Sequence, residues 1–308
     1  MRTNSPYWIG ALGLILAAAL PQAVHAVPQA PEMTFATPQE AGAALLAAAE
    51  HNDTAAMMKV LGAGSKDIVE SGDPAEDKNG RAQFAERAHA RMQVEIEPGN
   101  PNRAVLIVGE NDWPFPVPLL LQNGRWHFDA DRGRVEILAR RIGRNELAAI
   151  DVCRGYVEAQ MEYAARDRNA AGMLQYAQKI VSTPGKMDGL YWAGESGLVP
   201  KAFADAAAAM SAEGKKPEPY HGYYFRILKA QGPNAQGGAL DYVVKGQMIG
   251  GFALVAYPAE YSVSGVKTFQ VNHLGVVYEK DLGPTTETLA RQLIRFDPDK
   301  NWKAVVGE

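Results

Sequence analysis

The sequence contains a single cysteine, Cys153, in 308 residues. An intramolecular disulfide is therefore excluded, and the folded chain must be stabilised by burial of apolar surface. Cys153 falls on the apolar stripe of a predicted helix, whereas a nucleophilic thiol needs exposure and a nearby histidine. We therefore expect Cys153 to be a small buried side chain. No cysteine lies near the end of the N-terminal apolar segment, which excludes a lipid anchor on a new N-terminal cysteine.

The sequence also lacks an excess of positive charge. It has 31 Lys and Arg against 35 Asp and Glu, a formal net charge of −4 and a pI near 5.9. Proteins that attract nucleic acids or anionic lipids through a broad electrostatic field have the opposite balance. We therefore expect neither nucleic acid nor an anionic membrane surface as a partner.

Recognisable catalytic and metal-binding motifs are missing as well. There is no Gly-x-Ser-x-Gly elbow, no His-Glu-x-x-His and no phosphate-cradling loop. Residues 167–172 begin like a calcium loop, but Ala171 occupies a ligand position and Gln178 stands where the bidentate glutamate is required. The histidines are too scattered for a local metal site: His51, His89, His127, His221 and His273. We predict no catalytic residue, no metal and no cofactor.

The one long apolar run lies at the start of the chain. Arg2 precedes the apolar segment Ile9–Leu20, and Val24-His25-Ala26 follows. A basic start, a short hydrophobic stretch and small residues before a cut are typical of a signal peptide. The run is shorter than the roughly 20 residues of a membrane span. We expect cleavage near Ala26 and a mature chain, residues 27–308, that is exported to the periplasm or the extracellular space.

The first half of the mature chain predicts helices followed by an antiparallel meander. Capping boxes at Thr37 and Asp73 open two helices, and a short helix at 54–61 lies between them. Period-two alternation then indicates strands, and Asn123-Gly124 predicts a hairpin. The expected strands are Met92–Glu97, Arg103–Val108, Val117–Leu121 and Arg125–Phe128. This pattern predicts an α+β domain over residues 27–143.

The second half predicts a long helix and a second antiparallel sheet. A short basic helix is expected at 132–144, and we place the domain boundary at Gly143. A long amphipathic helix is expected from Asn145 to about Arg166. One further helix is expected at Ala202–Ala212, and a closing helix contains Leu289, Leu293 and Phe296. The expected strands are Tyr223–Leu228, Leu240–Val244, Phe252–Tyr257, Val266–Val271 and Val276–Asp281. Residues 144–308 are therefore expected to form a second α+β domain.

Five segments together resemble an exported bacterial family known as domain of unknown function 2950. They are Asn111–Pro116, Arg141–Glu146, Ser182–Lys186, Asp188–Trp192 and Tyr220–Phe225. The resemblance extends over nearly the whole mature length. It implies export and carries no activity.

The C-terminal half is also similar to the globular heads of type IV pilin-like proteins. The similarity rests on a long helix followed by Gly222–Arg226, Gly251–Pro258 and the hairpin Phe269–Val277. A pilin joins its hydrophobic N-terminal helix to the head, whereas the helix here lies in mid-chain and is amphipathic. The resemblance therefore implies at most a shared head fold, without polymerisation through a membrane-derived helix core.

Aromatic residues in the segments quoted above are the candidate ligand-binding residues. Trp113, Tyr191 and Trp192 lie in predicted loops, which carry binding residues more often than strands do. His221 and Tyr223 belong to a run of phenols and one imidazole that suits stacking on a carbohydrate or peptide. The structural alternatives are that the tryptophans fill the seam between domains and that the tyrosines are buried at a strand entry.

These observations favour a non-catalytic binding or assembly module that recognises an envelope protein or a cell-wall component. A rival hypothesis is an envelope hydrolase whose acid and base come together from distant positions such as His221, Asp241 and Glu260. A third is an accessory of pilus-like machinery. A deep polar cleft with His221 in hydrogen-bond reach of a carboxylate favours the hydrolase, and a shallow aromatic groove favours the binding module.

Overall fold

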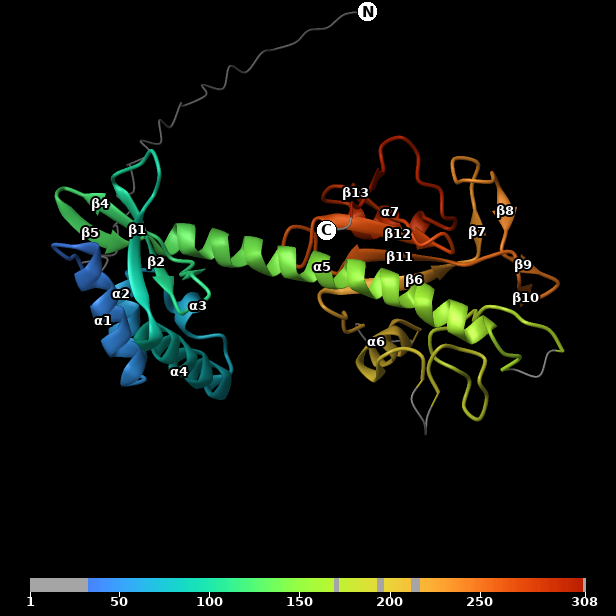
Figure 1. The fold of residues 1–308 in the computed structure, drawn as a ribbon, viewed down its shortest axis with the longest axis horizontal. Coiled ribbons are helices and arrows are strands. Elements are labelled where there is room, and N and C mark those ends of the chain that lie inside the picture. Colours follow the sequence, from blue (N-terminus) through green and yellow to red (C-terminus); the bar gives the residue numbers. More distant parts are fainter. Residues whose placement is uncertain (1–32, 169–171, 193–196, 212–216, 307–308) are drawn as a thin grey trace, which may run out of the picture.

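The computed structural model describes residues 33–168, 172–192, 197–211 and 217–306. The fold is α+β, as predicted, and Figure 1 shows two globular parts joined by one long helix. The predicted signal peptide lies outside the described residues. Among the residues that are described, no helix has the length and apolar character needed to cross a membrane.

Four helices open the N-terminal part. They are α1 (Pro38–Glu50), α2 (Thr54–Leu61), α3 (Lys66–Val69) and α4 (Pro74–Ala90). Both predicted capping boxes start a helix: the Thr37 hydroxyl accepts a hydrogen bond from the Glu40 N–H, and the Asp73 carboxylate accepts from Ala75 and Glu76. Side-chain acceptors of this kind satisfy N–H groups that have no partner within the helix.

An antiparallel sheet follows the helices. Its strands are β1 (Met92–Ile96), β2 (Arg103–Val108), β3 (Trp113–Pro114), β4 (Leu119–Gln122) and β5 (Arg125–Phe128). The order is β1-β2-β4-β5, and β3 pairs with β2. The predicted hairpin is confirmed: Asn123 and Gly124 have φ of 53° and 74° between β4 and β5. Helices and sheet enclose one core that includes Leu45, Leu61, Leu106, Leu119 and Phe128.

One continuous helix, α5 (Ala130–Ala164), replaces the two helices that we predicted around Gly143. A glycine within a helix costs roughly 1 kcal/mol, which good helix formers on both sides offset. The Glu136 carboxylate also accepts a hydrogen bond from Arg140 one turn on, at 2.8 Å. Between Gly133 and Ala149 no residue of α5 is buried, and Val135 and Leu147 are 68% and 65% exposed. This stretch contains residue 143 and lies between the two globular parts (Figure 1).

The C-terminal part contains a five-stranded antiparallel sheet. Its strands are β6 (Tyr223–Leu228), β11 (Ala253–Pro258), β12 (Lys267–Asn272), β13 (Val277–Asp281) and β14 (Lys303–Ala304), in the order β14-β13-β12-β11-β6. The predicted strand Leu240–Val244 is not in this sheet. It is divided into β8 (Leu240–Asp241) and β9 (Val243–Val244), which pair separately with β7 (Ala230–Gln231) and β10 (Gln247–Met248). Tyr242, between β8 and β9, is fully buried, and its N–H donates to the Lys229 carbonyl at 2.9 Å.

Helices cover both faces of this sheet. The C-terminal half of α5 and α6 (Lys201–Ser211) enclose the larger core, which includes Cys153, Tyr156, Phe203, Phe225 and Phe269. On the opposite face α7 (Thr286–Gln292) packs Ala290 against Tyr224 and Tyr257. The predicted closing helix is shorter than expected, because α7 ends before Leu293. The Arg226 guanidinium donates hydrogen bonds to the carbonyls of Ala290 and Leu293, both at 2.8 Å, and so satisfies the helix end.

Candidate functional site

Trp113 lies in the N-terminal part and packs at the start of α5. Its ring contacts Phe115, with centroids 6.1 Å apart, and the Arg140 guanidinium lies 5.5 Å above it. Arg140 also donates a hydrogen bond to the Pro114 carbonyl at 2.7 Å. The indole is half-buried, and its face is occupied by a cation from the same chain. All of these contacts lie within residues 27–143, so Trp113 packs inside the N-terminal part and not in a seam between the two proposed domains.

Tyr191 and Trp192 line a pocket of about 450 Å³ together with the loop 182–187. The backbone of Tyr191 pairs with the neighbouring segment: its N–H donates to the Ile180 carbonyl and its carbonyl accepts from Ser182, both at 2.8 Å. The Arg168 guanidinium lies 5.5 Å from the Trp192 ring. Both aromatic side chains are half-buried and remain accessible from the pocket.

His221 is exposed at the end of a groove of about 440 Å³ beside α5, lined among others by Tyr156, Phe203 and Tyr220. The Tyr220 and His221 ring centroids are 4.3 Å apart. Asp151, Glu158 and Glu162 of α5 also line this groove. In the described part of the chain, however, His221 makes no hydrogen bond or ion pair with any of these carboxylates.

Tyr223 is a core residue. Its side chain is fully buried, its ring lies 5.8 Å from that of Phe269, and its hydroxyl donates a hydrogen bond to the Lys267 carbonyl at 2.9 Å. Burial raises the pKa of this phenol well above its usual value. Tyr223 therefore matches the alternative of a buried strand-entry tyrosine, and its ring offers no surface to a ligand.

The three residues of the hydrolase hypothesis lie on separate elements. His221 precedes β6, Asp241 is exposed in β8, and Glu260 follows β11. Across the described ranges no hydrogen bond or ion pair joins any two of them. Cys153 is fully buried, as predicted, and burial raises the pKa of its thiol to about 12. Within the described residues no group of three His, Cys, Asp or Glu side chains is arranged to hold a metal ion. The segment 167–172, which begins like a calcium loop, lies partly outside those residues.

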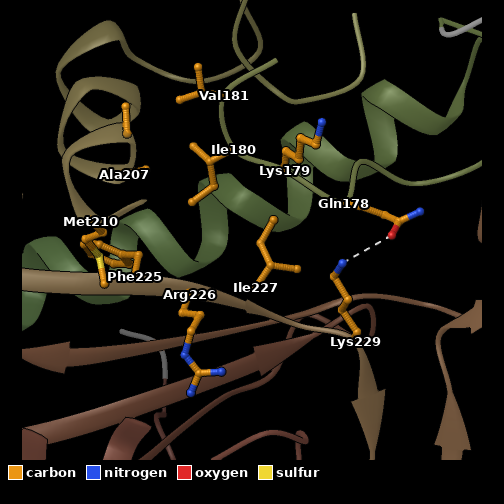
Figure 2. Close-up of a pocket in the computed structure, with 11 residues that line it drawn as sticks. Gln178, Lys179, Ile180, Val181, Ala207, Met210, Phe225, Arg226, Ile227 and Lys229 are labelled. Carbon is orange, nitrogen blue, oxygen red and sulfur yellow. Dashed lines mark hydrogen bonds between the residues drawn. The ribbon is translucent and has the colours of Figure 1, made fainter. Parts of the chain in front are cut away.

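A larger groove, which we name the β6 groove, lies between β6, α6 and the segment Gln178–Val181 (Figure 2). Its cavity volume is about 620 Å³, within the usual range for ligand sites. Figure 2 shows Ile180 and Ile227 pointing toward each other across it, while Arg226 points away toward the opposite face of the sheet. The α6 side is formed by Ala207, Ala208 and Met210. The sequence pattern did not indicate this groove, because its walls are ordinary apolar side chains from three distant segments.

The segment opposite β6 is positioned by two of the sequence segments that carry the family resemblance. The Asp188 carboxylate accepts hydrogen bonds from Lys179 Nζ at 2.8 Å and from the N–H and hydroxyl of Thr183 at 2.7 and 2.8 Å. Burial tends to raise the pKa of Asp188, but these hydrogen bonds outweigh it and lower the pKa to about 2. Gly189 allows close approach, since a Cβ there would lie 2.7 Å from the Ser182 nitrogen. Ser182–Lys186 and Asp188–Trp192 thus form one folded unit.

Comparison with known proteins identifies a family. The family model described as "Protein of unknown function (DUF2950)" matches residues 32–305, and the chain belongs to that family. No curated protein and no solved structure matches the chain.

Proposed function

We propose that this DUF2950 member is an exported cell-envelope protein that acts as a non-catalytic binding module, holding a partner in the β6 groove. The observation that carries the proposal is the groove itself: a 620 Å³ concavity with apolar walls and cationic residues, and with no Ser, Thr, Cys, His, Asp or Glu among its described lining residues. A site that binds a ligand without catalysing a reaction needs a complementary shape and a few polar groups, and this groove provides both.

Export is the second element of the proposal. Arg2, the apolar run Ile9–Leu20 and the segment Val24-His25-Ala26 support signal cleavage and release of a mature chain. In the native host, the protein recovered from the periplasmic or extracellular fraction should begin near Val27, as determined by intact mass and N-terminal sequencing. Recovery of the uncleaved chain from the cytosolic fraction would contradict export.

We further propose that the mature chain has two domains, residues 27–143 and 144–308. The fold of the second is similar to that of the globular heads of pilins. Two separate cores and the exposed middle of α5 support this division. The helix of a pilin polymerises through its hydrophobic N-terminal extension, whereas α5 is preceded by an entire globular part. A single binding unit, rather than a filament subunit, therefore fits this arrangement.

The binding function is tested by filling the groove. Ala208 is exposed on the α6 wall, so an Ala208→Trp substitution should fold and occupy the cavity. Ala202→Trp, exposed on the same helix outside the groove, is the matched control. Immobilised mature protein is incubated with the soluble envelope proteins of the host and, separately, with purified cell wall.

We expect one of the two fractions to contain a component that wild type and Ala202→Trp retain and that Ala208→Trp loses at least tenfold. Equal retention by all three proteins would overturn the groove as the binding site. Turnover of a wall-derived or peptide substrate by the wild type, lost in His221→Ala, would instead support the hydrolase alternative.

A further inference from the structure

The backbone edge of β6 is the first observation that identifies an occupant for the β6 groove. β6 is the terminal strand of its sheet and pairs with β11 on one side. On its other side Tyr223 exchanges two backbone hydrogen bonds with Tyr220, at 2.9 and 3.0 Å. Since alternate residues of an antiparallel strand direct both backbone groups to the same side, those of Phe225 and Ile227 also point outward.

These outward groups have no partner in the described part of the chain. Phe225 is 5% exposed beneath α6, whereas Ile227 is half-buried and opens into the groove. Beyond it the Lys229 carbonyl accepts a hydrogen bond from Tyr242 at 2.9 Å, which closes the edge. A free N–H and C=O in an apolar groove favour pairing with an added extended chain.

The charged residues of the groove give the second observation. Lys179, Arg226 and Lys229 are its charged lining residues, and all three are cations. Lys179 is paired with Asp188, and Arg226 donates to the end of α7. Lys229 is exposed, and its hydrogen-bond partner is the neutral amide oxygen of Gln178, at 3.4 Å. It therefore keeps its charge available for an anionic group, and Figure 2 shows both side chains at one end of the groove.

We propose that the β6 groove binds an extended, acidic segment of a partner protein by strand addition to β6. One apolar side chain of the segment lies between Ile180 and Ile227, and an Asp or Glu pairs with Lys229. This inference rests on the proposed function, because it names the partner class of the same groove. Backbone hydrogen bonds provide affinity in this mode, while alternate side chains provide specificity.

Selection from a random peptide library tests the inference directly on the groove. Random decapeptides displayed on phage are depleted on the Ala208→Trp variant and then selected on the wild-type mature chain. We expect enrichment of sequences with alternating apolar residues and an Asp or Glu at a fixed spacing from them. Failure to enrich any sequence, or enrichment without that pattern, would overturn the proposal.

A synthetic copy of the selected peptide then tests the two contacts separately. Lys229→Glu should weaken binding at least tenfold, and replacing the acidic residue of the peptide by Lys should restore it. The control Lys78→Glu makes the same charge change at an exposed position of α4 and should leave affinity unchanged. N-methylation of the peptide amide that faces Ile227 should also weaken binding at least tenfold, whereas N-methylation of the next amide should not. If neither Lys229→Glu nor N-methylation of the amide that faces Ile227 weakens binding, strand addition is overturned.

The two proposals fail in different ways. If Ala208→Trp loses an envelope component but no peptide of the expected pattern is selected, strand addition is wrong and the binding function stands. If the component that Ala208→Trp loses comes from the cell wall and is not a protein, strand addition is likewise wrong and the binding function stands. If Ala208→Trp retains every component that the wild type retains, the groove itself is not the binding site.

Discussion

The N-terminal and C-terminal parts use their aromatic residues and strand edges differently. In the N-terminal part Trp113, expected in a loop, instead lies in β3, and its ring is covered by Arg140 of α5. In the C-terminal part Tyr191 and Trp192 line an accessible pocket, and the edge of β6 faces an apolar groove. The comparison teaches that aromatic residues expected in loops from the sequence pack internally in one part and line a concavity in the other.

The largest expected effects test whether the two parts are energetically separate. Leu106→Ala removes a fully buried side chain from the N-terminal core and should cost about 2–5 kcal/mol. Phe252→Ala removes a ring that lies between Tyr156 and Tyr176 and should cost about 3–5 kcal/mol. Hydrogen exchange measured by mass spectrometry should show faster exchange in the mutated half, with the other half unchanged. Faster exchange in both halves for either variant would mean one cooperative unit.

Two glycines of α5 sharpen the comparison between its packed and its exposed stretches. A Cβ at Gly133 would lie 2.7 Å from the Val117 side chain, so Gly133→Ala should destabilise the N-terminal part by about 1–3 kcal/mol. A Cβ at Gly143 meets no atom within 4 Å. Gly143→Ala should therefore stabilise the helix by about 0.5–1 kcal/mol. Urea unfolding measures both, and equal effects of the two substitutions would contradict the difference in packing.

Asp188→Asn tests how firmly the segment beside the β6 groove is held. The pKa of Asp188 falls from 3.8 to about 2 on folding, so the carboxylate contributes at most about 2 kcal/mol at neutral pH, and less where solvent screens it. Because the folded-state pKa is depressed, this contribution is complete above pH 4 and is lost as the pH falls toward 2. Urea unfolding should show wild type more stable than Asp188→Asn at pH 7, with the difference shrinking below pH 4. A difference independent of pH would contradict the charge-based explanation.

Sequence patterns predicted the structure correctly where local chemistry decides the outcome. Side-chain caps at Thr37 and Asp73 and the turn at Asn123-Gly124 are local signals, and the structure confirms all of them. The patterns were misleading where distant segments decide. On β12 Thr268, Gln270 and Asn272 alternate with apolar residues, and their burial was not predicted. All three are at most 1% exposed, and Gln270 accepts a hydrogen bond at 3.3 Å from the N–H of Asp297, a residue far along the chain.

The candidate site follows the same division. The sequence drew attention to Tyr191, Trp192 and His221, which do line concavities, but also to Trp113 and Tyr223, which pack internally. The β6 groove was missed because an apolar wall of Ile180 and Ile227 looks like core in a linear sequence. The signal that could have drawn attention to it is the glycine- and proline-rich stretch before β6. After such a stretch only Tyr220 pairs with the outer edge of β6 among the described residues, and Phe225 and Ile227 are left without a backbone partner there.

The smallest expected effect concerns His221, at the residue where the binding and hydrolase hypotheses diverge. His221 is exposed, has φ of 48° and makes no hydrogen bond among the described residues. Asn tolerates that conformation well, so His221→Asn should change the free energy of unfolding by less than about 0.5 kcal/mol. Retention of the envelope component should also be unchanged, because His221 lies in the groove beside α5 and not in the β6 groove. If retention falls with His221→Asn but not with Ala208→Trp, the ligand occupies the groove beside α5. The binding site is then that groove and not the β6 groove.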